Sequence, residues 1–424
     1  MQYEINIFDN LSNLRSLYAA KADELNRLEY EFRTKTRFIT HKHFRIARRL
    51  KKRWITLGGE FELNITMYEF SDKGVMKREL YYHDKILKNL AICKYDFELV
   101  KACILADLNN TKLPTEVVAK QPSKQHLFYL KKRFKIDEQI RAKNKLEISK
   151  NEAILAGQKN SKIHLEIDDL FINFQGRKYG EKLRCREAII HSNFIGGNRS
   201  NKRKKNRSAI CLFFLKKLSA KSDQNNDLNY FSNRLNDYIE KLNLNKNSII
   251  FKGDGARWMK SISQKIGVKY VLDYFHLVKK INETFGFNHF ASKENKKVFT
   301  NWYSAKYRLR WVELFRKIFS KNDKLGYEAY VNFRDNFIFE ARQKQINNKC
   351  LLAAKRLFYF IENHKDQIWN DENKICLIAS YTEHFVFNYF KKHIKKMSST
   401  FGLSSIKTKI IYKNLKKGVG TIFL

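Results

Sequence analysis

The stretch SIIFKGDGARWM, followed closely by VLDYFHL, constrains the fold of this chain more than any other feature. Residues 248–252 form a short apolar run typical of a buried strand, and Gly-Asp-Gly follows at 253–255. Residues 268–272 have the same character and lead into Asp273 and His276. Helix-like sequence separates the two runs, so we predict a β-α-β unit with an acidic residue after each strand.

These acidic residues predict a functional site. Open α/β sheets place their sites at the carboxyl ends of their strands, where Asp254 and Asp273 occur. Carboxylate oxygens are ligands that suit hard cations such as magnesium. The pattern favours a magnesium-dependent enzyme that acts on phosphate esters.

The net charge points to a polyanionic partner. The chain has 424 residues, with 84 Lys and Arg against 43 Asp and Glu, a formal charge of +41. A field of this sign attracts nucleic acid, and each neutralised phosphate releases counterions. An AT-rich genome would also enrich Lys, Asn, Ile, Phe and Tyr, but such bias does not remove Asp and Glu. We therefore expect a nucleic acid as the partner; the resemblance described below implies that it is double-stranded DNA.

Cysteine spacing and hydropathy exclude several classes of protein. The six cysteines lie far apart without a CxxC pair, which disfavours both a zinc finger and a disulfide framework. The first residues, MQYEINIFDN, do not resemble a signal peptide. The apolar run 209–215 is much shorter than the about 20 residues that span a bilayer. We expect a cytoplasmic, nucleoid-associated protein with no membrane partner.

The N-terminal part of the chain predicts two regions. Residues 11–53 are expected to form a long basic helix within a basic helical region at 1–53. Alternation around Gly58-Gly59 then predicts a small β hairpin. Together with a linker, residues 54–160 are expected to hold this β element and a helix-turn-helix-like DNA-binding module, although a plain helical bundle is the alternative. Its short helices are predicted at about 97–108, 114–120 and 123–134.

The pattern changes at residue 162. KIHLEIDDLFINFQ and the segments 183–191 and 209–215 predict three strands, and the order from 162 onward is β-β-β-α-β-α-β. A loop at 196–208 between the second and third strands is either a solvated surface loop or a contact for DNA phosphates. Its six basic residues are Arg199, Lys202, Arg203, Lys204, Lys205 and Arg207.

This order is the one expected of an α/β ribonuclease-H-like catalytic domain. We assign its first part to residues 161–276 and an aromatic-rich, all-α insertion to 277–375. Residues 376–424 would supply the last catalytic helix and a C-terminal tail. The N-terminal DNA-binding region, mainly helical with its small β element, precedes this domain.

Such a domain needs three carboxylates from distant parts of the sequence. Asp168 ends the segment LEID, Asp254 follows the fourth strand, and Glu383 in IASYTEHFVFN is the candidate from the last helix. Together they would hold two magnesium ions about 3.5–4 Å apart, with manganese as a substitute. Asp169 lies on the opposite face of the strand from Asp168, so strand register decides between them. The alternatives are a turn at Asp254, a strand-end cap at Asp168 and a solvated Glu383.

The combination GDGARWM, Asp273-Tyr274-Phe275-His276 and a late Glu resembles the DDE transposases of the Mutator-like superfamily. Within it, the chain is most similar to Lre-type insertion-sequence transposases and to transposases of bacterial integrative conjugative elements. LEID at 165–168 and the element at 56–68 also match, so the resemblance covers nearly the whole chain in order. After Glu383 the sequence departs from the family, because HIKKMSSTFGLSS lacks the expected proline and tryptophan.

This resemblance implies metal-dependent DNA strand cleavage and strand transfer at the ends of a mobile genetic element. Asp168, Asp254 and Glu383 would be the catalytic metal ligands, with Asp273 and His276 as accessory residues. The protein would act as a homo-oligomer on DNA. Two alternatives stay open: a ribonuclease-H-like nuclease that cuts without joining, and a domesticated DNA-binding protein without catalytic activity.

Overall fold

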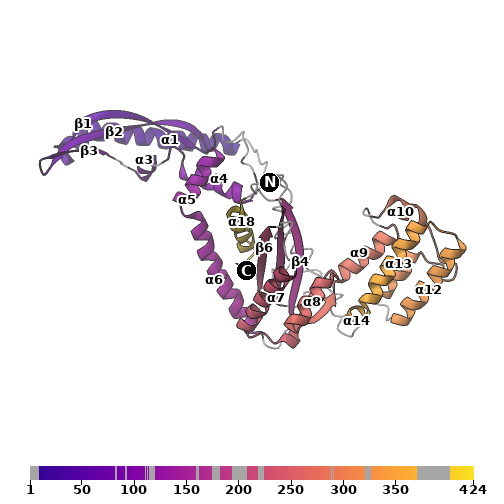
Figure 1. Ribbon diagram of the computed structural model, residues 1–424. Coiled ribbons are helices and arrows are strands. Elements are labelled where there is room, and N and C mark those ends of the chain that lie inside the picture. The colour runs from indigo at the N-terminus through magenta and orange to yellow at the C-terminus, as the bar shows by residue number, and fades with distance from the viewer. Residues whose placement is uncertain are drawn as a thin grey trace, which may run out of the picture. The chain divides into compact units, whose positions relative to one another are not determined.

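The computed structural model divides into two compact units, Met1–Ile140 and Arg141–Leu424. The first unit holds a three-stranded sheet and the second a six-stranded sheet (Figure 1). The structure describes residues 9–81, 84–90, 93–109, 111, 113, 120–158, 162–173, 182–192, 208–217, 224–287, 289, 291–319, 326–369 and 402–424.

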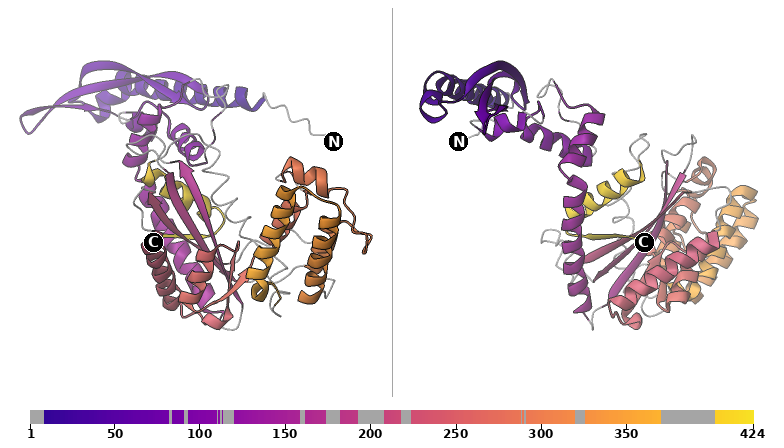
Figure 2. Two further views of the ribbon diagram at one scale, coloured as in Figure 1. Left: turned by 45° about the vertical axis from the view of Figure 1, so that its right-hand side comes forward. Right: turned by 60° about the vertical axis from the view of Figure 1, so that its left-hand side comes forward.

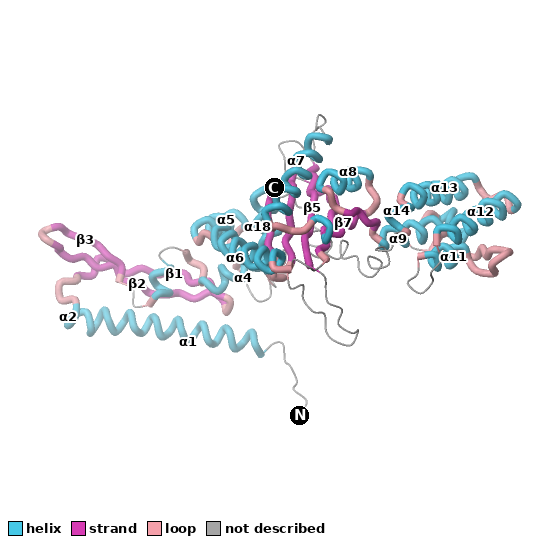
Figure 3. Tube along the Cα trace, turned by 90° about the horizontal axis from the view of Figure 1, so that it is seen from below, coloured by secondary structure: helices cyan, strands magenta, loops and turns pink. Residues whose placement is uncertain are grey.

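Helix α1 (Asp9–Glu31) lies along the sheet of the first unit (Figure 2, Figure 3). Its Leu25 packs against Leu63 and Ile65, which face it from the middle strand. This apolar contact joins the helix to the sheet, because neither element buries its apolar side alone. The strands are antiparallel and follow one another in sequence order as β1 (Arg45–Thr56), β2 (Gly59–Asp72) and β3 (Val75–Leu80).

The long helix predicted over residues 11–53 is wrong in its last part. The helical conformation ends at Thr40, and RIARRLKKR belongs to strand β1. The predicted hairpin at Gly58-Gly59 is confirmed, and it pairs this basic segment with β2. Gly59 has a φ of +128°, and a Cβ on Gly58 would meet the Leu14 carbonyl oxygen at 2.7 Å. The basic residues of RIARRLKKR are compatible with a helix, but pairing with β2 makes this segment a strand.

Short helices complete the first unit. The helices predicted at 97–108 and 123–134 are confirmed as α4 and α5, whereas residues 114–119 lie outside the described part of the chain. Ser123 caps α5, because its hydroxyl accepts the backbone N–H of His126 at 3.2 Å. The elements are a π-helical turn (Phe32–Thr36), α2 (Arg37–Thr40), α3 (Lys85–Leu90), α4 (Phe97–Asn109), α5 (Lys124–Arg133) and α6 (Ile136–Ala156), most of which belongs to the second unit.

The sheet of the second unit confirms the predicted order β-β-β-α-β-α-β. Its strand order is β8-β7-β4-β5-β6-β9; β4, β5 and β6 are antiparallel, whereas β7 and β8 run parallel to β4. The elements are β4 (Ile163–Asn173), β5 (Lys182–Ser192), β6 (Ala209–Lys217), α7 (Gln224–Lys241), a 3₁₀ turn (Lys246–Ser248), β7 (Ile249–Gly253), α8 (Arg257–Ile266) and β8 (Lys269–Leu272).

Helices cover both faces of this sheet, so the second unit is a mixed α/β unit (Figure 2). On one face, Leu165 and Ile167 of β4 enter a core with Phe231 of α7 and Ile262 of α8. On the other face, helix α18 packs its Ile406 and neighbouring residues against β5 and β6. The sheet is therefore the central layer of the unit.

The C-terminal part of the chain adds an element that the sequence analysis did not predict. Helix α18 (Leu403–Leu415) leads into strand β9 (Gly420–Phe423), which pairs parallel to β6. Helix α6 holds this strand, because the amide of Asn144 accepts the N–H of Thr421 at 3.0 Å and donates to its carbonyl oxygen at 2.7 Å.

The predicted helical region after residue 276 is also confirmed within the described residues (Figure 1). Its core is aromatic, with Trp302, Trp311 and Phe337 buried together, whereas Tyr359 is 63% exposed. No described helix has the length and apolar character to cross a membrane. The helices are α9 (Tyr274–Thr284), α10 (Lys293–Phe299), α11 (Trp311–Ile318), α12 (Tyr327–Gln343), α13 (Asn348–Asn363) and α14 (Lys365–Ile368).

Candidate active site at Asp168 of β4 and the turn after β7

The turn after β7 has a conformation that only its sequence allows. A Cβ on Gly253 would meet the Met259 sulfur at 2.3 Å, and Gly255 has a φ of +92°. Between them, the half-buried Asp254 accepts the backbone N–H of Ala256 at 2.9 Å through Oδ1. The Gly-Asp-Gly sequence therefore fixes one carboxyl group at the start of α8, where the helix dipole favours negative charge.

Tyr270 holds this turn from the neighbouring strand β8. Its hydroxyl oxygen accepts the backbone N–H of Gly255 at 2.9 Å. Burial raises the pKa of Tyr270 well above its usual value, and the nearby Asp254 and Asp273 add to this shift. The phenol therefore stays protonated and neutral beside the aspartates.

The two adjacent aspartates of β4 have different surroundings. Asp169 forms an ion pair with Arg186 of β5, through Nε at 2.7 Å and Nη2 at 2.8 Å. The guanidinium of Arg186 also lies 3.9 Å from the ring centroid of Trp258. Asp169 thus joins the sheet to α8, while strand alternation directs Asp168 to the opposite face.

Strand register brings Asp168 level with Asp254. Strands β4 and β7 are parallel, and Glu166 pairs with Lys252. Two residues further along, Asp168 lies on the same face of β4 as Glu166, and Asp254 begins the turn after β7. The expected strand end after Asp168 is wrong, because β4 continues for five more residues to Asn173. Asp168 therefore lies within β4, level with the first residue of the turn after the neighbouring strand β7.

Asp273 follows β8 and has a structural role there. It is 2% exposed, caps α9 by accepting the N–H of Phe275 at 2.9 Å, and donates its own N–H to the Gly253 carbonyl oxygen at 2.8 Å. Nε2 of His276 lies 3.8 Å from Asp273 Oδ2. Asp273 therefore ties the end of β8 to the turn that carries Asp254, and it positions His276.

Behind Asp168, the same face of the sheet buries a cluster of charged and polar side chains. Glu166, His191 and Lys252 are at most 3% exposed. Oε1 of Glu166 lies 3.3 Å from His191 Nε2 and 3.7 Å from Lys252 Nζ. The His191 ring also stacks on that of His164, with 5.2 Å between the ring centroids. We call His164, Glu166, His191 and Lys252 the buried polar cluster.

The buried polar cluster was not predicted, although the sequence contains the alternating pattern that indicates it. In KIHLEIDD, the polar residues His164, Glu166 and Asp168 alternate with the apolar Leu165 and Ile167. Alternation usually indicates a strand with one face in water. Here both faces are buried, so the polar one requires partners on neighbouring strands.

Two buried thiols lie near the carboxyl groups of this sheet. Burial raises the pKa of the Cys185 thiol well above its usual value, and Glu187, Asp169 and Asp168 add to the shift. The Cys211 thiol on β6 shows the same direction, caused by burial and then by Glu187. Both thiols therefore stay neutral near the carboxyl groups.

The donor set of this site fits a hard divalent cation. Asp168 and Asp254 offer only oxygen ligands, the type that magnesium prefers. Within the described ranges, no group of three or more His, Cys, Asp or Glu is arranged to hold a metal ion. The third predicted ligand, Glu383, lies outside those ranges, as do the predicted DNA-binding residues Arg199, Lys202, Arg203, Lys204, Lys205 and Arg207.

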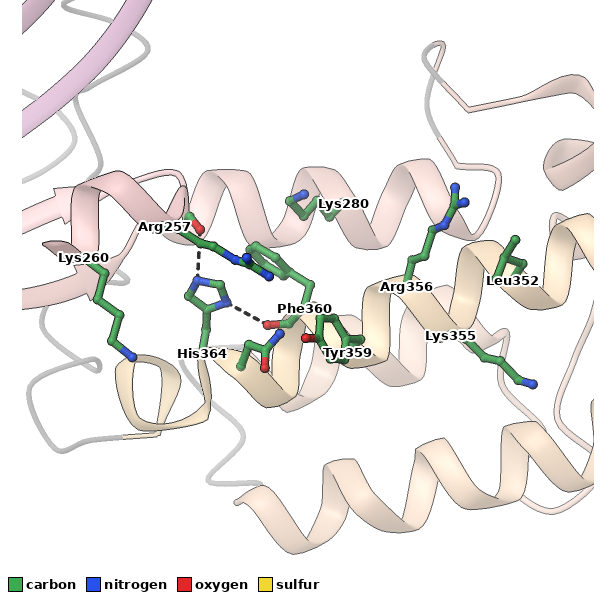
Figure 4. Close-up of a pocket in the computed structure, with 11 residues that line it drawn as sticks. Arg257, Lys260, Lys280, Leu352, Lys355, Arg356, Tyr359, Phe360 and His364 are labelled. Carbon is green, nitrogen blue, oxygen red and sulfur yellow. Dashed lines mark hydrogen bonds between the residues drawn. The ribbon is translucent and has the colours of Figure 1, made fainter. Parts of the chain in front are cut away.

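A basic hollow of about 670 Å³ lies beside the same turn (Figure 4). It extends from Gly255 to the face of α13, and His364 joins its two sides. The imidazole of His364 lies 3.1 Å from the Gly255 carbonyl oxygen and 2.8 Å from that of Phe360. Its basic lining residues come from α8, α9 and α13 and are Arg257, Lys260, Lys280, Lys355 and Arg356.

Comparison with known proteins adds no family assignment. No protein-family model matches the sequence, and no curated protein is significantly similar to it. The function is therefore inferred from the residues and geometry of the site itself.

Proposed function

We propose that this protein is a DDE-type DNA transposase that cleaves DNA at the ends of a mobile genetic element and joins the freed strands to target DNA. The observation that carries this proposal is the placement of Asp168 and Asp254. The register of the parallel strands β4 and β7, in which Glu166 pairs with Lys252, supports Asp168 and Asp254 coming level two residues further along, with the buried polar cluster behind Asp168. Paired carboxylates in such positions are the arrangement that phosphoryl transfer by metal ions requires.

The fold and the charge support the same proposal. Three antiparallel strands followed by alternating helices and parallel strands are the order expected for a ribonuclease-H-like domain. The helices from α9 to α14 would then be the insertion in that domain. A formal charge of +41 suits a partner with one negative charge per phosphate.

Asp168, Asp254 and Glu383 would hold magnesium, or manganese in its place. When bound, the ions would supply Lewis-acid activation of the attacking oxygen and stabilisation of the leaving oxygen. The protein holds Asp254 ready for this role, because the Ala256 N–H and the Gly253–Gly255 turn fix its position. Such preorganisation lowers the energy needed to assemble the site.

Other residues of the chain would orient the catalytic carboxylates and bind DNA. Asp273 fixes the first turn of α9, and His276 Nε2 lies 3.8 Å from its carboxylate. His276 would donate a hydrogen bond to a carboxylate or to DNA. The basic loop at 196–208 would contact backbone phosphates of DNA. Because two element ends must be brought together, the protein would act as a homo-oligomer. As a DNA-binding protein it would be found in the nucleoid.

Cleavage and joining of labelled DNA that carries the element's ends tests this proposal. We expect wild type to nick and join strands with magnesium or manganese. Asp168→Asn, Asp254→Asn and Glu383→Gln should bind the same DNA but lose both reactions, because each removes a metal-binding charge. Binding is followed in the same samples by gel shift.

Asp169→Asn is the matched control, since it removes a charge from the neighbouring residue on the opposite face of β4. It should retain cleavage per folded molecule. Cleavage without joining would instead indicate a nuclease. Binding without cleavage in either metal would indicate a DNA-binding protein without catalytic activity.

A further inference from the structure

The turn that carries Asp254 is held from two directions. From the side of β8, the Tyr270 hydroxyl accepts the Gly255 N–H at 2.9 Å. Also from this side, the N–H of Asp273 donates to the Gly253 carbonyl oxygen at 2.8 Å. The Gly255 carbonyl oxygen has its partner elsewhere, in the helical region after β8. The two peptide groups of one glycine are therefore held by two different parts of the chain.

His364 makes this second contact from the end of α13 (Figure 4). Its Nε2 lies 3.1 Å from the Gly255 carbonyl oxygen, although the two residues are 109 positions apart in the sequence. Because a carbonyl oxygen only accepts, Nε2 donates this hydrogen bond. Nδ1 lies 2.8 Å from the carbonyl oxygen of Phe360, one turn back in the same helix. One ring nitrogen thus faces the turn and the other faces α13.

Phe360 packs against the same turn. A Cβ at residue 255 would lie 2.8 Å from the Phe360 ring, so this close approach needs a glycine. The centroids of the Phe360 and His364 rings are 4.5 Å apart. Lys280 of α9 lies over the Phe360 ring, with its Nζ 4.3 Å from the centroid. Helix α13 therefore brings one polar and one apolar contact to Gly255.

We infer that His364 is a positioning residue of the active site: it holds the turn in the conformation that brings Asp254 level with Asp168. Glycines on both sides of Asp254 give the backbone unusual freedom, so the conformation of the turn depends on the bonds that hold it. The inference rests on the proposed function only for the role of Asp254 as a metal ligand. The helical region would then be part of the framework of the site.

Hydrogen–deuterium exchange on the full chain tests whether His364 holds the turn. Gln can place a donor where Nε2 lies, whereas Asn places one where Nδ1 lies, so these substitutions separate the two contacts. His364→Asn and His364→Ala should speed exchange over residues 250–259 by about three- to tenfold, whereas His364→Gln should stay within about twofold of wild type. Exchange over residues 183–191 should be unchanged, because β4 separates β5 from β7.

Binding of Mn²⁺ alone, followed by electron paramagnetic resonance, tests whether the held turn matters for the site. His364→Asn should weaken Mn²⁺ binding by about three- to tenfold, and His364→Gln should bind within about twofold of wild type. Asn363→Ala is the matched control, because its exposed side chain forms no hydrogen bond in the described part of the chain. This control should match wild type in both measurements.

The outcomes separate this inference from the proposed function. Wild type that binds no Mn²⁺ would contradict the proposed function, while the exchange rates would still decide whether His364 holds the turn. Unchanged exchange in His364→Asn would overturn the inference. Faster exchange without any loss of Mn²⁺ affinity, in a wild type that binds Mn²⁺, would also overturn it. Equal effects of His364→Gln and His364→Asn would do the same, because the Gly255 contact would then not be the cause.

Discussion

The two faces of strand β4 differ in chemistry although both are buried. On one face, Leu165 and Ile167 enter the apolar core below α7 and α8. On the other face, His164 is 5% exposed and Glu166 1% exposed, and both contact polar partners. Alternation therefore gives β4 an apolar face and a polar face, although β5 and β6 carry an apolar core on the side of the polar face.

The difference shows which face contributes to stability and which supports a site. Burying apolar side chains stabilises the fold by about 25 cal/mol per Å². Burying charges carries a desolvation penalty that their partners only partly offset, so an apolar replacement of the same shape is often as stable. A buried polar cluster directly behind Asp168 is therefore better explained by a functional role than by stability.

The largest effect is expected from removing the central carboxylate of the polar face. Glu166→Ala should lower the free energy of unfolding by about 3–5 kcal/mol, because Lys252 loses its buried counter-charge and His191 loses its carboxylate partner. Urea denaturation measures this change. Glu166→Gln, which keeps the shape and an acceptor, should lose less. An unchanged midpoint for Glu166→Ala would show that the cluster contributes no stability.

The apolar face should respond as an ordinary core does. Leu165→Ala should cost about 2–5 kcal/mol, since Leu165 is fully buried and its truncation leaves a cavity. Leu146→Ala on α6 is the control, because that side chain is 74% exposed and should change stability by less than about 0.5 kcal/mol. Equal effects in the same urea titrations would contradict the packing described for β4.

The polar side of the sheet should also show an alkaline dependence. The pKa values of Cys185 and Cys211 are raised in the folded state, so above about pH 8.5 the unfolded chain loses these protons first. Stability should then fall by about 1.4 kcal/mol per pH unit for each thiol. Cys185→Ala should make the dependence between pH 8 and 10 shallower. A slope equal to that of wild type would contradict the raised pKa.

The smallest stability effect is expected at Asp168. Asp168→Asn should change the free energy of unfolding by less than about 0.5 kcal/mol, because the amide keeps an oxygen for the Asp169 N–H. The matched Asp169→Asn weakens two charged hydrogen bonds to Arg186 and should cost about 1–3 kcal/mol. Thermal unfolding compares the two variants; a larger loss at Asp168 would reverse the assignment of faces.

Much of the second unit follows from local sequence. Apolar runs predict β7 and β8, and the glycines at 253 and 255 mark a turn that the packing of Met259 and Phe360 explains. The position of Asp168 relative to Asp254 could not be predicted, because it depends on the register between β4 and β7.

Two strands could not be predicted from local sequence for different reasons. Strand β1 carries basic residues on both faces, and only its pairing with β2 makes it a strand. Strand β9 has four residues, too few for a periodic signal, and its partners come from β6 and from Asn144. In both cases distant residues decide the local structure.

The pairing of β9 with β6 has a consequence for the synthesis of the protein. Ile210 pairs with Gly420, so the ribosome adds roughly 200 residues after β6 before its partner strand exists. At about 5–20 residues per second this takes about 10 to 40 s. During that time β6 has an open hydrogen-bonding edge, which is prone to pair with another nascent chain. Newly made molecules are therefore vulnerable to aggregation throughout the interval between the synthesis of β6 and that of β9.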